Sequence, residues 1–178
     1  MAIHTPIISP CRSEAVPSFC PTPVTTLFGT MMRDLSTYIE AERDLEHCGS
    51  WDPACDQWIR DAEFARARVL DKITTLREAP TRRREDFPLK RCADLAKMLI
   101  ESDSPEQCNT ILALPDRFPH FFRCASDSPV ARRVNLMVSA FRQHLHTLAT
   151  LSDFTGMVEA GAVSTERDEP VTLLAPAA

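Results

Sequence analysis

The chain has 178 residues, of which 44% are hydrophobic and 25% charged, and its formal net charge at pH 7 is −5. This length suits one domain with flexible ends, and the composition lies outside the range of fully disordered chains. The negative charge argues against a protein that coats nucleic acid or anionic membranes, since both need a summed positive field. No apolar run approaches the ~18 to 20 residues that a bilayer-spanning helix needs. We therefore expect no membrane partner.

The chain holds only 4 glycines against 14 prolines. Strands joined by tight turns would need more glycine, so the composition favours an all-α fold. Residues 1–22 are rich in Pro, Ser and Thr and predict a disordered N-terminal arm without the features of a secretory signal. The seven cysteines lack any C-x-x-C spacing. Without an export signal we expect reduced thiols and a cytoplasmic protein.

Two long amphipathic helices are predicted over residues 23–79. Thr22-Pro23 provides an N-cap followed by proline at the first helical position. The apolar spacing then continues to about His47, and a second stripe runs from Pro53 to Ala79 before Pro80. The short connection predicts an antiparallel, coiled-coil-like hairpin with an acidic outer face.

A smaller helical unit should follow the hairpin within a single domain that covers residues 23–151. We expect a basic linker at 80–88, helices at 89–101 and 105–112, and a final long helix at 129–151. Between the last two helices, a loop rich in Pro and Phe should cover part of the core. Residues 152–178 carry five acids and one arginine and predict an acidic, disordered tail.

The stretch from Leu27 to Leu99 resembles small, uncharacterised helical proteins of bacterial genomes, some of them encoded near prophage genes. The resemblance rests on the long acidic helix, on the sequences Leu70-Asp71-Lys72-Ile73 and Pro80-Thr81, and on Asp94-Leu95-Ala96-Lys97-Met98-Leu99. The run Arg82 to Arg84 departs from that pattern. The resemblance implies a helical fold and no particular activity.

The helices at 89–101 and 105–112 have the spacing of a helix-turn-helix, which favours a DNA-binding regulator as one function. The second helix would present Gln107 and Asn109, whose amides can pair with adenine. Phosphate contacts would come from arginines in neighbouring segments, namely Arg91, Arg132 and Arg133. This helix has no Arg or Lys of its own, and helix pairs of this kind are common as simple packing units.

We expect no enzyme activity, cofactor or metal. The sequence has no nucleophile elbow, Walker A or dinucleotide-binding motif, and its few glycines leave little material for a phosphate loop. His47, Cys48 and Cys55 have zinc-ligand chemistry, but a structural site needs four ligands. In an oxidising environment Cys48 and Cys55 are near enough in sequence to form a disulfide, provided the geometry allows it.

The leading prediction is a non-enzymatic interaction or assembly protein that binds a protein partner or a second copy of itself. Trp51 lies in the hairpin connection, where an exposed tryptophan can anchor a partner. Arg82, Arg83 and Arg84 form a basic group in the linker and are the other expected partner contacts. Helical patterning explains neither of these features.

Overall fold

The computed structural model describes residues 20–47, 55–151 and 154, and within them the chain is all α-helical. Most of the expected N-terminal arm and acidic tail lies outside this part of the chain. The described residues form six helices: α1 (Pro23–Glu46), α2 (Cys55–Glu78), α3 (Asp86–Ile100), α4 (Pro105–Arg117), α5 (Pro119–Phe122) and α6 (Pro129–Ala149).

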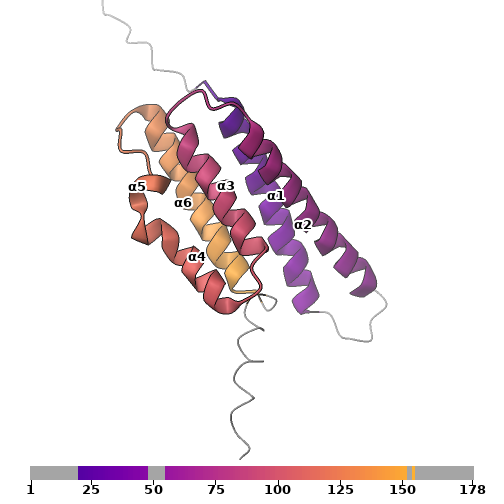
Figure 1. Ribbon diagram of the computed structural model, residues 1–178. Coiled ribbons are helices and arrows are strands. Elements are labelled where there is room, and N and C mark those ends of the chain that lie inside the picture. The colour runs from indigo at the N-terminus through magenta and orange to yellow at the C-terminus, as the bar shows by residue number, and fades with distance from the viewer. Residues whose placement is uncertain (1–19, 48–54, 152–153, 155–178) are drawn as a thin grey trace, which may run out of the picture.

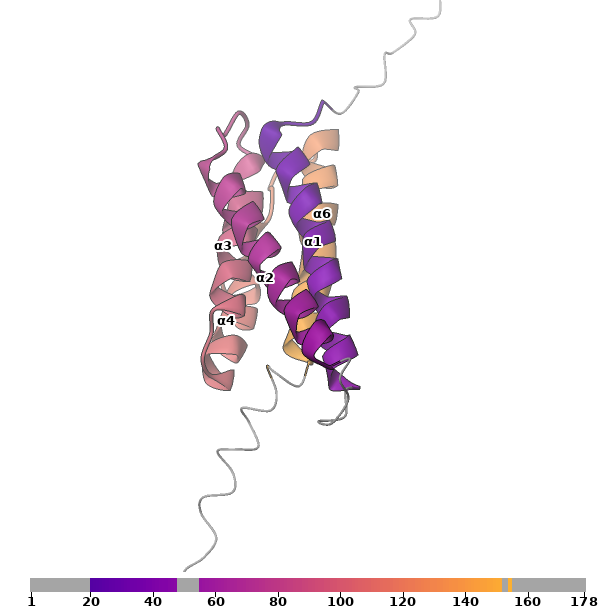
Figure 2. The same cartoon turned by 90° about the vertical axis from the view of Figure 1, so that its right-hand side faces the viewer.

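Helix α3 occupies the centre of the arrangement and packs against each of the other five helices. Helices α1 and α2 lie side by side on one flank of α3, and α4 with α5 lies on the other (Figure 1). The view from the side shows α6 beside α1 (Figure 2). Whatever fixes the start of α3 therefore affects the placement of the whole bundle.

Three of the helices begin at a side-chain cap, and the first of these caps is the predicted one at Thr22. Thr22 caps α1: its hydroxyl accepts from the Thr25 amide at 3.2 Å, while its own amide donates to the Thr25 hydroxyl at 2.7 Å. Ser104 caps α4 and Ser128 caps α6 by a single bond each, in which the serine hydroxyl accepts from a backbone amide three residues later. A proline follows each of these three caps at the first helical position.

The predicted apolar stripes form the core. Phe28 of α1 meets Phe141 of α6 with ring centroids 5.8 Å apart, which joins the first helix to the last. The predicted stripe of α2 is buried from Ala62 onwards, whereas Trp58, one turn earlier, is only half-buried. Helices α1 and α2 are also joined by an ion pair, in which the buried Asp34 of α1 pairs with Arg68 of α2.

The predicted linker at 80–88 is too long, because α3 begins at Asp86 and not at Leu89. Pro88 therefore lies inside the first turn of α3. A proline is tolerated there, since the first turn of a helix contains backbone N–H groups that have no intrahelical acceptor. In the sequence, Pro88 resembles a residue that precedes a helix, and for this reason the start of α3 was predicted too late.

The predicted fourth helix is too short. Helix α4 continues past Leu112 to Arg117 and includes Pro115, and the next residues form the short helix α5 where a loop was expected. The Phe118 amide donates to the Leu114 carbonyl at 2.9 Å, so the backbone hydrogen bonding continues beyond the proline. The final helix ends at Ala149, close to the expected position.

The carboxylate of Asp86 joins the start of α3 to the start of α1. Only 1% of Asp86 is exposed. Its Oδ1 accepts from the Thr22 hydroxyl at 2.7 Å, and its Oδ2 accepts from the backbone amides of Arg82 and Arg83 at 2.9 and 3.1 Å. One side chain thus closes the turn before α3 and holds the N-cap of a helix 64 residues earlier in the chain. Hydrogen bonds to an ionised acceptor are among the strongest in proteins.

Asp86→Ala should therefore lower the free energy of unfolding by about 2 to 4 kcal/mol, because one buried donor and two partly buried donors lose their acceptor. Chemical denaturation followed by circular dichroism measures the effect. Asp71→Ala removes an exposed acid of α2 and should change stability by less than about 0.5 kcal/mol. Equal stability of the two variants would contradict the assigned role of Asp86.

Candidate docking surface

Four large apolar side chains are exposed on one side of the bundle, over α3 and α5 and the residue that joins α4 to α5. Phe87 is 50% exposed, Met98 49%, and Phe118 and Phe121 40% each. Single exposed apolar residues are common, but a continuous group of them marks a binding site in many soluble proteins. Together with nearby arginines these residues form what we call the aromatic-basic face: Phe87, Met98, Phe118, Phe121, Arg84, Arg91, Arg117 and Arg123.

Arg91 holds the short helix α5 against α3. Its Nη1 donates to the Phe121 carbonyl at 3.1 Å, and its guanidinium carbon lies 4.5 Å from the centroid of the Phe121 ring. Arg117 lies over the Phe118 ring in the same manner, at 5.9 Å. These cation-π contacts keep positive charge next to exposed rings. The face therefore combines apolar area with fixed cations.

Two recesses meet at Arg91. The first, the apolar groove, has a volume of about 340 Å³ and lies between α3, α4 and α5. Asp94 is the only acid among its lining residues, and it is paired with Arg77 at 2.8 Å. The groove is lined by Arg91, Asp94, Leu95, Met98, Leu114, Phe118, Phe121 and Phe122. An apolar side chain from a partner can enter it without meeting an unpaired carboxylate.

The second, the basic recess, has a volume of about 520 Å³. Its lining includes three arginines, which are Arg84, Arg91 and Arg123, together with His120. Glu85 is its only acid. Arginine forks bind carboxylate and phosphate oxygens in a bidentate manner, so the recess suits an anionic group. Groove and recess together favour a ligand that has an acidic part and an apolar part.

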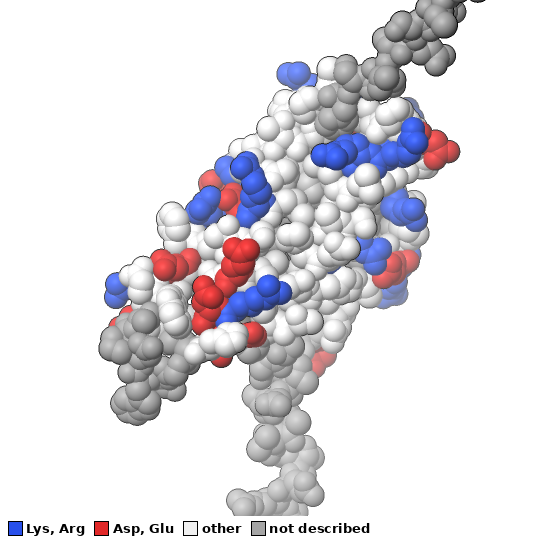
Figure 3. All heavy atoms as spheres, turned by 180° about the vertical axis from the view of Figure 1, so that it is seen from behind, with Lys and Arg blue, Asp and Glu red and all other residues white. Residues whose placement is uncertain are grey.

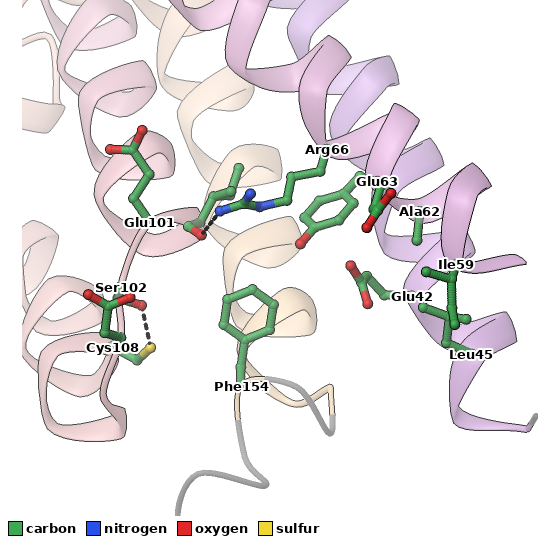
Figure 4. A pocket seen from close by; sticks show the side chains of 13 residues that line it. Glu42, Leu45, Ile59, Ala62, Glu63, Arg66, Glu101, Ser102, Cys108 and Phe154 are labelled. Atoms are coloured by element: carbon green, nitrogen blue, oxygen red, sulfur yellow. Dashed lines mark hydrogen bonds between the residues drawn. The ribbon is translucent and has the colours of Figure 1, made fainter. Parts of the chain in front are cut away.

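A third hollow of about 500 Å³, which we call the acidic cleft, lies between α1, α2 and the turn from α3 to α4 (Figure 4). Its carboxylates are Glu42, Glu63, Glu101 and Asp103. The only guanidinium, that of Arg66, donates to the Ile100 carbonyl at 3.1 Å and so caps the end of α3. Phe154 points into the cleft from below (Figure 4). The cleft is thus partly filled by the chain itself.

The structure places the predicted partner contacts as follows. Trp51 lies outside the described residues. Arg82 and Arg84 are exposed and Arg83 is half-buried. The backbone amides of Arg82 and Arg83 bind Asp86, so this segment is a fixed turn. Of the three side chains, only that of Arg84 lines a recess of the aromatic-basic face.

The residues expected to contact DNA are not brought to one surface. Gln107 and Asn109 are exposed near the start of α4, at the end of the bundle where α6 finishes. Arg132 and Arg133 lie near the start of α6, about 25 Å away along that helix. Arg91 is engaged with Phe121. Figure 3 shows the side opposite to Figure 1. On this side basic and acidic side chains lie in mixed clusters, and uncharged surface separates one cluster from the next.

The cysteines differ from the expectation of reduced thiols in one respect, since Cys55 is disulfide-bonded. The expected partner, Cys48, lies outside the described residues. A disulfide sulfur is not a thiolate ligand. The disulfide therefore counts against the hypothesis that His47, Cys48 and Cys55 bind zinc. Among the described residues, no group of three or more side chains could hold a metal ion.

Cys20, Cys92, Cys108 and Cys124 are free thiols. Burial raises the pKa of the Cys92 thiol far above its ordinary range, and the field of Arg142 opposes this only in part. Burial, aided by the charge of Glu85, also raises the pKa of Cys124. These two thiols are therefore poor nucleophiles, because the thiolate is the reactive form.

The sequence did not reveal the exposed part of the aromatic-basic face. Phe121 and Phe122 are adjacent, and in a helical turn neighbouring side chains point about 100° apart. Phe122 is therefore buried while Phe121 is exposed. One sequence feature could have indicated the exposed ring: two adjacent phenylalanines follow Pro119. A short helix cannot bury two adjacent rings against a single neighbouring helix.

No family model, curated protein or solved structure matches this chain. None of the helices in the described ranges is long and apolar enough to cross a membrane.

The thiol environments predict a pattern of alkylation. In the native protein at pH 8, iodoacetamide should modify exposed Cys20 at least about 100-fold faster than Cys92, which should react only after global unfolding. Mass spectrometry of peptides from a time course measures both rates. Comparable rates at the two positions would contradict the burial of Cys92.

Proposed function

We propose that this chain is a non-enzymatic interaction protein and that the aromatic-basic face is the surface with which it binds a protein partner. The observation that carries the proposal is the exposure of Phe118 and Phe121, at 40% each, beside an apolar groove that Arg91 lines, with Arg117 over the Phe118 ring. Phenylalanine, methionine and arginine are among the residue types enriched in protein interfaces.

The rigidity of the face supports this role. Phe118 and Phe121 lie with ring centroids 6.3 Å apart, and the Phe121 ring is 4.1 Å from that of His120. The Asn135 side chain accepts from the Cys124 amide at 2.9 Å and donates to the Cys124 carbonyl at 3.1 Å, which fixes the segment after α5 to α6. A surface that is already ordered loses little conformational entropy on binding.

The acidic cleft supports the proposal less well. Its lining is net negative and Phe154 already occupies part of it. The DNA-binding alternative has no supporting observation in the arrangement of Gln107, Asn109, Arg132 and Arg133. We therefore restrict the proposal to protein binding through α3, α4 and α5.

A photo-crosslinking amino acid placed at position 118 or 121 tests the proposal in cells that express the chain. We expect protein adducts at both positions and none at position 64, because Phe64 is 66% exposed on α2 but lines neither recess. The adduct should contain an acidic segment of the partner. Equal crosslinking at position 64, or no adduct at 118 and 121, would refute the docking surface.

Once a partner is purified, Phe118→Ser combined with Phe121→Ser should weaken its binding by at least about tenfold, as the loss of hot-spot aromatics does elsewhere. Phe64→Ser is the matched control and should leave the affinity unchanged. Isothermal titration calorimetry measures the affinities, and circular dichroism verifies that the variants remain folded. A double variant that binds as well as the native chain would show that the face is not used.

A further inference from the structure

The aromatic-basic face needs an occupant with two kinds of chemistry, arranged in a particular order. The basic recess and the apolar groove are neighbours that share Arg91 in their linings. A single extended segment can therefore fill both only if a cluster of acids directly adjoins a cluster of apolar residues. A uniformly acidic segment would leave the groove empty, and a uniformly apolar one would leave the arginines unpaired.

Residues 166–174 of this chain have that order. Glu166, Asp168 and Glu169 supply the acids, and Val171, Leu173 and Leu174 supply the apolar side chains directly afterwards. Over residues 155–178 there are four acids and one arginine. The charge of the segment is thus opposite to that of the recess, where three arginines and His120 face one glutamate.

The segment is also long enough to reach. Phe154 shares the acidic cleft with Cys108 of α4, and ten helical residues separate Cys108 from Phe118, a distance of about 15 Å. The 19 residues from Phe154 to Leu173 span up to roughly 60 Å when extended. Linking the two groups in one chain raises their effective concentration well above that of a free partner.

From these observations we infer that residues 166–174 dock on the aromatic-basic face of the same chain, with the acids in the basic recess and the leucines in the apolar groove. This inference rests on the proposed function, since it assigns an occupant to the same face. A protein partner would then have to displace the segment, and the segment would act as an intramolecular competitor that sets the threshold for binding.

Proteolysis at Arg167 of the 178-residue chain tests the inference, because a docked segment is protected. The measured quantity is the rate at which trypsin releases the fragment 168–178, followed by mass spectrometry. We expect release to be about tenfold faster in Phe118→Ser/Phe121→Ser and in Leu173→Ser/Leu174→Ser than in the native chain. Phe64→Ser is the control and should match the native rate, and 0.5 M salt should accelerate release from the native chain.

Release rates that agree within about twofold in the native chain and both double variants would overturn the inference. A native rate that rises on 100-fold dilution would also overturn it, because the segment would then come from a second copy. Either result leaves the proposed function intact if crosslinks at positions 118 and 121 still capture a partner. Protection that disappears in both double variants without partner capture would instead support the docked segment and count against the proposed function.

Discussion

The structure depends on one buried carboxylate. Asp86 receives hydrogen bonds from the Thr22 hydroxyl and from the amides of Arg82 and Arg83, so the first turn of α3 is tied to the N-cap of α1. Helix α3 packs against each of the other described helices. The position of its first turn therefore affects the position of every helix in the bundle. Two further contacts hold the flanks of α3: Lys90 donates to the Ala79 carbonyl at the end of α2, and Arg66 donates to the Ile100 carbonyl.

The same junction explains where the aromatic-basic face lies. With the start of α3 fixed, Arg91 is placed one turn beyond the buried Pro88 and can stack on Phe121 while binding its carbonyl. Helix α5 is only four residues long and has little internal hydrogen bonding to sustain it. Its position therefore depends on α3, on the end of α4 and on the hydrogen bonds that Asn135 makes to Cys124.

Sequence patterns predicted the all-α fold and the long helices because these depend on local features, namely the cap at Thr22 and apolar residues at helical spacing. They misplaced the start of α3 and the end of α4, since Pro88 and Pro115 resemble helix breaks until their surroundings are known. The aromatic-basic face was not predictable. It forms where Arg91 of α3 meets Phe121, 30 residues later, and no local pattern encodes that contact.

We propose that residues 166–174 and a protein partner compete for the aromatic-basic face. The positive charge of this face favours a segment that carries acids beside apolar residues. The most direct test is an isotope-edited nuclear Overhauser measurement on the 178-residue chain with labelled leucine methyls and phenylalanine rings. Our account predicts cross-peaks between the methyls of Leu173 or Leu174 and the ring protons of Phe118 or Phe121. The absence of these cross-peaks, with random-coil shifts for both leucines, would contradict it.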